Sequence, residues 1–304
     1  MNKKEFLIRA LDTSNAFIST DSEAVAVNPN IWDFRLRDYE EKNLVVTPLA
    51  EQFDFRGAGV DYKVTIDDAP SSASGLTETV DVTISSFSTR NVTFTPTEYG
   101  AAYQITRKEA VRAFFNVAER MVKKLGYSMA QKKDSLAVST IQDGAGNSVI
   151  VNSKSATTDL ASTDTLDLAS ITKAIKLNEE DLYVDNFALL VNYSQKQSLL
   201  DITQLQKANE FGTRSAINSG VVGSLFGLNV VVSHSIPTAS NVAKAIVLGR
   251  SQTGESAFGY AIKRDPIIER EYHARGRFWD IVGHEEYDFK VLHPNAICTI
   301  ASYA

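Results

Sequence analysis

Histidines and paired carboxylates are the residues of this sequence whose types could support chemistry. Three of its four histidines, His273, His284 and His293, follow one another near the C-terminus. Three imidazoles can bind zinc, but these three lack the helical spacing of a two-histidine zinc motif. Asp67-Asp68 and Glu285-Glu286 are adjacent carboxylates, and adjacent residues of a strand point to opposite faces. Neither pair is therefore expected to share a proton for acid–base catalysis.

Nucleotide-binding and nucleophile motifs give no stronger signal. The glycine-rich segment 220–227 resembles a dinucleotide-binding turn, but it precedes an expected strand instead of joining a strand to a helix. No glycine-rich segment continues into Lys-Ser or Lys-Thr, and no serine lies in a Gly-x-Ser-x-Gly elbow. We predict no catalytic, cofactor-binding or metal-binding residues and no cofactor. A nucleotide-dependent α/β enzyme stays the alternative from another functional class.

Composition and charge indicate an ordinary globular protein. The chain has 304 residues, 43% of them hydrophobic and 22% charged, which suits about two domains. The net charge of −6 argues against a surface built to hold duplex nucleic acid. The lone cysteine, Cys298, excludes an internal disulfide and is expected to be a buried thiol in an apolar run. We expect no secretory signal and no membrane span, because the longest apolar stretch, 221–232, is short and interrupted.

The first third of the chain has the pattern of strands. Residues 1–35 have no clean periodicity and are expected to form an arm that depends on a partner. Strands are predicted at 44–47, 62–66, 79–84, 92–94 and 103–105, where β-branched and aromatic residues recur. The polar tip 67–75 predicts a long β-hairpin with no evident apolar face. Such a hairpin is marginal alone and needs a neighbour to pack on.

One long helix is predicted over 106–141. Thr106 and Glu109 form a capping box at its start, and Gln142-Asp143-Gly144 is a stop signal. Apolar residues at helical spacing form one stripe: Val111, Phe114, Ala118, Met121, Leu125, Met129 and Leu136. The segment carries eight basic and three acidic residues, a net charge of +5, which leaves −11 for the remainder.

The basic residues of this helix are a candidate contact surface. Arg112, Arg120, Lys123 and Lys124 lie opposite the apolar stripe at 100° per residue, whereas Lys132 and Lys133 flank it. A solvated helix face is one explanation for this charge. The other is a surface that meets either a polyanion or an acidic patch on a neighbouring subunit.

The remainder of the chain predicts an α/β unit followed by strands. A short strand at 149–151 and a polar linker at 152–164 precede helices at 168–182 and 194–202 and strands at 188–192, 228–233 and 245–249. Long strands are expected at 275–282 and 287–291, followed by the apolar run that contains Cys298.

This order of elements resembles the major capsid proteins of tailed bacteriophages, which have the Hong Kong 97-like fold. The resemblance lies mainly in the last third of the chain, in segments 223–233, 245–249, 257–260, 268–272, 277–282 and 293–296. It implies an α+β fold with an N-terminal arm, an extended β-hairpin loop, a long spine helix, a peripheral domain and an axial domain. The implied boundaries are 1–35 for the arm, 36–59 for the first part of the peripheral domain, 60–100 for the extended loop, 101–164 for the peripheral domain with spine helix 106–141, 165–260 for the axial domain and 261–304 for the return strands.

The resemblance also implies a function and partners. The chain would be a structural head protein that self-assembles as hexamers and pentamers into an icosahedral shell around double-stranded DNA, without sequence-specific binding or a membrane. It would be made in the host cytoplasm and reside in the virion capsid, with a separate scaffolding protein, a portal and a decoration protein as further partners. Lys63, Asp67 and Asp68 would make contacts between subunits through the extended loop. An encapsulin-like bacterial nanocompartment is the alternative with the same fold.

Overall fold

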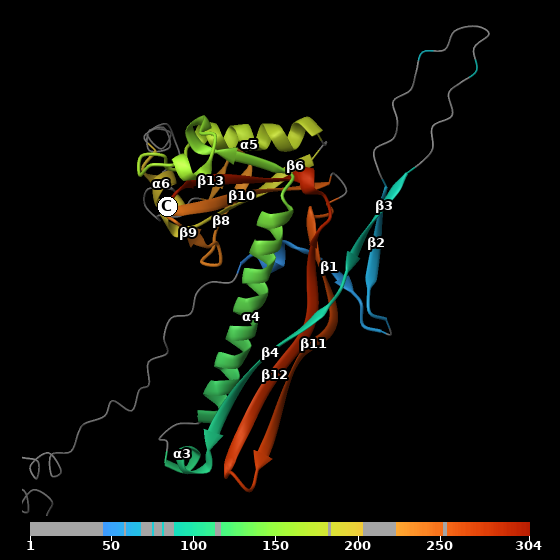
Figure 1. Ribbon diagram of the computed structural model, residues 1–304, viewed down its shortest axis with the longest axis vertical. Coiled ribbons are helices and arrows are strands. Elements are labelled where there is room, and N and C mark those ends of the chain that lie inside the picture. The colour runs from blue at the N-terminus through green and yellow to red at the C-terminus, as the bar shows by residue number, and fades with distance from the viewer. Residues whose placement is uncertain are drawn as a thin grey trace, which may run out of the picture. The chain divides into compact units, whose positions relative to one another are not determined.

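The computed structural model describes residues 45–57, 59–67, 75, 81, 88–112, 117–181, 184–202, 223–251 and 254–304. Its described strands form a four-stranded sheet, a seven-stranded sheet and a two-stranded hairpin (Figure 1). The predicted arm 1–35 lies outside the described residues, as do 18 of the 41 residues of the predicted loop 60–100, among them Asp68 and all of the strand expected at 79–84 except Asp81.

The four-stranded sheet, here called the long sheet, has the order β1-β11-β12-β4. Its members are β1 (Glu51–Asp54), β4 (Thr97–Thr106), β11 (Phe258–His273) and β12 (Phe278–Val291). Strands β11 and β12 form one antiparallel hairpin, so the two strands expected at 275–282 and 287–291 are a single strand, and residues 275–277 form the turn before it. Pairing with β11 on one edge, with irregularities on either side of Arg264, and with β4 over residues 278–287 on the other keeps β12 extended.

Helix α4 (Val117–Gly144) runs along one face of the long sheet (Figure 1). Its residues Leu125 and Met129 pack with Ile105 of β4 and Ile281 of β12. Gly283 lies directly beneath the helix, where an added Cβ would stand 2.8 Å from Met129 Sδ and 2.9 Å from Leu125 Cδ2. We call this the helix face of the long sheet and its opposite the open face.

The structure divides the predicted helix 106–141 into α3 (Arg107–Arg112) and α4, with residues 113–116 outside the described range. The Glu109 amide donates to Thr106 Oγ1 at 3.2 Å, so the first half of the expected cap forms. The stripe is confirmed at Leu125 and Met129 but wrong at Val111, which is 77% exposed. Val111 belongs to α3, a separate helix to which the spacing of α4 does not extend.

The seven-stranded sheet has the order β5-β13-β10-β6-β8-β7, with β9 paired to β10. Its strands and helices are β5 (Asn147–Ile150), β6 (Val184–Val191), β7 (Ser224–Leu225), β8 (Leu228–Val232), β9 (Thr238–Ala239), β10 (Val242–Ser251), β13 (Ile297–Tyr303), α5 (Leu168–Asp181) and α6 (Tyr193–Leu200). The predicted helices and strands of this region are confirmed. The sheet takes β5 and β13 from outside the range 165–260.

Both faces of the central strands of the seven-stranded sheet are buried, which explains their almost continuous apolar runs. Leu189 of β6 and Val247 of β10 pack in a cluster with Ile171 and Ala174 of α5. The alternating residues Leu190 and Ile246 pack in a second cluster with the end of α4. Helix α4 therefore joins the two sheets, because its first half packs on the long sheet and its second half on this one.

The β-hairpin forms from β2 (Tyr62–Asp67) and β3 (Thr89–Phe94), which pair antiparallel. The expectation that it has no apolar face is wrong for this base. Phe94 is fully buried and packs with Ala261 of β11, while Tyr62, Val64, Ile66 and Val92 are partly buried beside it. The rings of Phe53 and Phe55 pack on Tyr62 in tilted geometry, with ring centres 6.0 and 5.3 Å away. Aromatic packing on the long sheet thus holds the hairpin base in place.

The strand predicted at 44–47 does not form where the structure describes it. Val45 and Val46 lie in irregular chain, and Thr47–Leu49 is a turn of 3₁₀ helix. The amides of Val46 and Thr47 donate to a carboxylate of α4 instead of to a neighbouring strand.

Candidate functional site

The three histidines that could have formed a metal site are spread along the long sheet. His273 ends β11, His284 pairs with Ile267 in the middle of β12, and His293 follows β12. Across the part of the chain that the structure describes, no three His, Cys, Asp or Glu side chains are grouped to hold a metal. Glu285 and Glu286 point to opposite faces as expected, since Glu285 pairs with Lys133 of α4 and Glu286 with Lys263.

Cys298 is buried in β13 and packs with the apolar residues around α5. Burial raises the pKa of its thiol to about 12, and the positive charge of Lys173 lowers it only in part. The thiol is therefore uncharged at neutral pH and unsuited to act as a nucleophile.

Asp134 of α4 is a fully buried carboxylate that ties three parts of the chain together. Its Oδ1 accepts from the amides of Val46 and Thr47 at 2.8 and 2.9 Å and from Thr47 Oγ1 at 3.2 Å. Its Oδ2 accepts from Ser235 Oγ, which follows β8, at 2.9 Å. Hydrogen bonds to an ionised acceptor are stronger than neutral ones. Asp134 therefore joins residues 46–47, which precede β1, to α4 and to the segment that follows β8.

Lys133, the preceding residue, is enclosed on the helix face of the long sheet. Its Nζ lies 3.2 Å from Glu285 Oε2, and only 16% of the lysine and 6% of the glutamate side chain are exposed. The same ammonium lies 4.7 Å from the ring centre of Tyr287 and 5.3 Å from that of Tyr260. Burial, then the charge of Glu285, raises the pKa of the Tyr287 hydroxyl far above its usual range. The phenol stays neutral, and its ring stabilises the ammonium through a cation–π contact.

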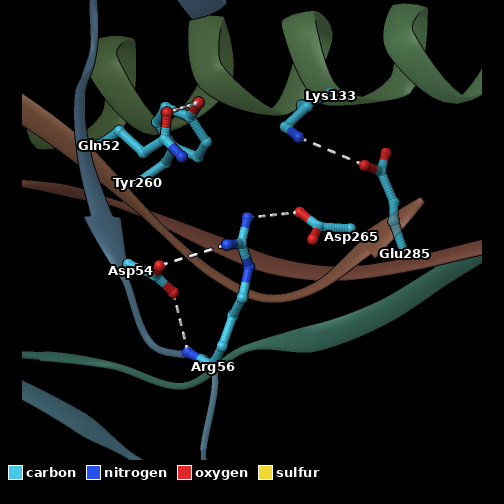
Figure 2. A network of polar contacts seen from close by, with 7 residues as sticks. All are labelled: Gln52, Asp54, Arg56, Lys133, Tyr260, Asp265 and Glu285. Carbon is cyan, nitrogen blue, oxygen red and sulfur yellow. Dashed lines mark hydrogen bonds and ion pairs between the residues drawn. The ribbon is translucent and has the colours of Figure 1, made fainter.

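A second polar contact joins β1 to β11 (Figure 2). The Arg56 guanidinium donates to Asp54 Oδ2 at 3.3 Å and to Asp265 Oδ1 at 2.8 Å, and Tyr260 Oη donates to Gln52 Oε1 at 3.1 Å. The Arg56 side chain is half exposed, so its ion pairs contribute less than the enclosed pair of Lys133 and Glu285. These contacts hold β1 and the residues that follow it against β11.

The predicted basic residues lie on two elements. Arg120, Lys123 and Lys124 belong to α4, where Lys123 is exposed and the other two are half-buried. Arg112 is the last residue of α3, and its side chain lies outside the described part. The structure therefore groups three of the four on the first turns of α4.

The predicted loop residues lie at the hairpin. Lys63 is exposed in β2 opposite Thr93 of β3, and Asp67 is the last residue of β2, opposite Thr89. Asp68 lies outside the described residues.

Sequence reasoning missed Asp134 and the pairing of Lys133 with Glu285. One signal for Asp134 was present, because it precedes Ala137, Val138 and Ile141 by three, four and seven residues. That spacing places the carboxylate on the same helix face as three buried apolar residues. For Lys133 the sequence shows no such signal, because its partner is 152 residues away.

The comparisons with known proteins agree with this architecture. Residues 90–300 match the family model described as phage capsid protein. Within the described residues, no helix has the length and apolar character that crossing a membrane requires. A search of curated proteins finds no match.

Solved structures with a similar fold include three from phages. A structure titled "Mycobacterium phage Che8" has 14% identity and a TM-score of 0.73, covering 90% of this chain and 96% of that one. The capsid of cyanophage P-SCSP1u has 15% identity and a TM-score of 0.73, with coverages of 92% and 93%. The acid-stable capsid of Helicobacter pylori bacteriophage KHP30 has 12% identity and a TM-score of 0.77, with coverages of 96% and 100%.

The family match and the fold define the class of protein to which this chain belongs. The family model matches more than two thirds of the chain, including β4, α4 and most strands of both sheets. The chain is a member of the phage capsid protein family, and it has the mixed α+β fold of phage capsid structures. It is a structural protein of the phage capsid.

Proposed function

We propose that the chain is the major capsid protein of a tailed bacteriophage, with a Hong Kong 97-like fold, and that it assembles as hexamers and pentamers into an icosahedral shell around double-stranded DNA. The family match over residues 90–300 carries this proposal. A fold shared with phage capsids over nine tenths or more of the chain supports it. In this role the protein works mechanically and is no enzyme.

The proposed domains follow from this fold. Residues 1–35 form the N-terminal arm, 36–59 and 101–164 the peripheral domain with its spine helix, 60–100 the extended loop, 165–260 the axial domain and 261–304 the return strands. The packing of α4 on both sheets supports one body in which the spine helix connects the two domains. Since β5 and β13 pair within the seven-stranded sheet, we add these two strands to the axial domain.

Negative-stain electron microscopy of the purified, expressed protein tests this function. Icosahedral shells, or hexamers and pentamers, are the expected products. A subunit that stays monomeric at every concentration and salt condition tested would contradict the proposal.

A nanocompartment shell would give similar particles, so a second measurement is needed. Phage heads recovered from infected cells should contain DNA that resists added nuclease, whereas an encapsulin-like shell would enclose an enzyme. The hairpin favours the capsid, because β2 ends at Asp67 and β3 begins at Thr89, so that 21 residues of sequence separate the two paired strands.

The basic residues of α4 have a proposed role in this shell. Arg120, Lys123 and Lys124 contact either the packaged DNA or an acidic patch of a neighbouring subunit, together with Arg112 of α3. Changing the three α4 residues to Gln should weaken assembly or DNA retention. A triple variant that keeps both assembly and DNA retention would show that these side chains form only a solvated helix face.

The extended loop has a proposed role between subunits, through Lys63, Asp67 and Asp68. Deleting residues 67–75 should leave a folded subunit that assembles poorly, because the hairpin base is held by its own packing on the long sheet. Shells of normal form and thermal stability would contradict this role. A separate scaffolding protein, a portal and a decoration protein are the proposed further partners, and the virion capsid is the proposed location.

A further inference from the structure

The far end of the long sheet carries opposite charges on its two faces. Cross-strand partners lie on the same face, and residues alternate between faces along each strand. Ile281 and Gly283 contact α4, so Trp279 shares the helix face with them. Their partners on β11 are Tyr272, Arg270 and Ile268, which places these three on the helix face as well.

The intervening residues of the same segment lie on the open face. Ile267, Glu269 and Glu271 of β11 pair with His284, Val282 and Asp280 of β12, respectively. The six residues Ile267 to Tyr272 thus put two carboxylates on one face and an arginine with a tyrosine on the other. A strand that alternates in charge sign between its faces makes each face of the sheet electrically distinct.

Each face combines its charge with exposed apolar side chains. On the helix face, Ile268, Tyr272 and Trp279 are 40%, 36% and 43% exposed, and the Tyr272 and Trp279 rings lie 4.6 Å apart. On the open face, Ile267 and Val282 are 42% and 38% exposed. Tryptophan, tyrosine and arginine are the residues that dominate binding energy in protein interfaces. We define the aromatic patch as Ile268, Arg270, Tyr272 and Trp279. We define the acidic patch as Ile267, Glu269, Glu271, Asp280 and Val282.

We propose that the aromatic patch of one subunit docks on the acidic patch of a second copy of this chain. The partner is another copy because the patches complement each other but lie on opposite faces of one sheet, so a single chain cannot bring them together. The contact is heterologous, and repeated heterologous contacts form a ring when the rotation between copies closes. This inference rests on the proposed shell function and names one contact within it.

Charge reversal tests the pairing. Arg270→Glu makes both patches acidic and should raise the protein concentration required for half-maximal assembly by about tenfold or more, less so at 1 M salt. Glu269→Arg with Glu271→Arg makes both patches basic and should act similarly. All three changes in one chain restore opposite charges, and assembly should return to within about threefold of wild type.

Matched controls separate the contact from folding. Lys173→Glu, the same charge reversal on the exposed side of α5, should leave assembly unchanged. Circular dichroism and thermal unfolding of the unassembled subunits establish that each variant is folded. Trp279→Ala should weaken assembly without any change of charge.

Two results would overturn the inference. One is an Arg270→Glu variant that assembles at wild-type concentrations, and the other is a folded triple variant that assembles no better than Arg270→Glu alone. Electron microscopy of the wild type in the same series distinguishes the two proposals. Shells from both wild type and Arg270→Glu overturn the docking contact alone, whereas no wild-type assembly under any condition overturns the shell function and this contact together.

Discussion

Replacing Asp134 by alanine should destabilise the subunit more than any surface change on the same helix. The substitution removes an acceptor that takes four hydrogen bonds and leaves the buried amide of Val46 and the part-buried amide of Thr47 without it. An unsatisfied buried donor costs about 1–3 kcal/mol. With some relaxation of the chain around residue 46, the expected loss is about 3–5 kcal/mol, or a fall in Tm of about 10 °C for a body of this size.

Asp134→Asn separates hydrogen bonding from mere size. Asparagine keeps an oxygen that can accept from the amides of Val46 and Thr47, while its amide nitrogen must donate to Ser235 Oγ, which then accepts. The expected loss is about 1–2 kcal/mol, because neutral acceptors make weaker bonds than carboxylates. Asp143→Ala, an exposed position of the same helix, serves as the control and should stay within about 0.5 kcal/mol of wild type.

Denaturant unfolding of the unassembled subunit, followed by circular dichroism, measures these differences as shifts of the midpoint at constant slope. An Asp134→Ala variant within about 1 kcal/mol of wild type would refute the reasoning. A larger stability loss for Asp134→Asn than for Asp134→Ala would also refute the reasoning, because the amides of Val46 and Thr47 would then gain nothing from the side-chain oxygen.

Three further predictions concern other buried groups. Lys133→Met should lower the free energy of chemical unfolding by about 3–5 kcal/mol, because it leaves Glu285 buried and unpaired. Adding Glu285→Gln should recover part of this loss, and strictly additive losses would contradict a coupled pair. His293 has its pKa lowered by burial and then by the charge of Arg90, so the unfolded chain takes up a proton that the folded chain resists. Stability should therefore fall as the pH drops below about 6.5, and His293→Gln should flatten that fall; an unchanged pH profile would exclude His293 as its source. Cys298, with its pKa raised to about 12, should resist alkylation by iodoacetamide at pH 8 until the subunit is unfolded, and rapid labelling of the native protein would contradict its burial.

Local patterns were sufficient where an element is determined by its own residues. The amphipathic spacing of 168–182 predicted α5 almost to the residue, and the apolar runs 188–192 and 245–249 predicted β6 and β10. These segments bury the faces that their periodicity indicates, in the clusters on the two sides of one sheet. The lone cysteine was likewise expected in the core from its apolar neighbours.

Other elements could not be predicted because their partners are distant in the chain. The β-propensity of 44–47 favoured a strand, yet the amides of Val46 and Thr47 bind a carboxylate 87 or 88 residues later. The hairpin was predicted to lack an apolar face, because the residues that pack on it, Phe53, Phe55 and Ala261, belong to other strands or segments. A tertiary contact overrode local β-propensity at 44–47, whereas the hairpin strands formed as their propensity predicts.

The sequence alone determined most of the order of elements, the presence of a long central helix, the uneven charge and the resemblance to phage capsid proteins. The alternation of charge in Ile267 to Tyr272 was also present in the sequence. Without the register of β11 on β12, however, it could not be assigned to the two faces of the sheet. Only the tertiary structure decided which face of the long sheet α4 covers, and hence that Arg270 lies on the helix face and the carboxylates beside it on the open face. Periodicity determines which residues share a face, whereas packing determines what each face meets.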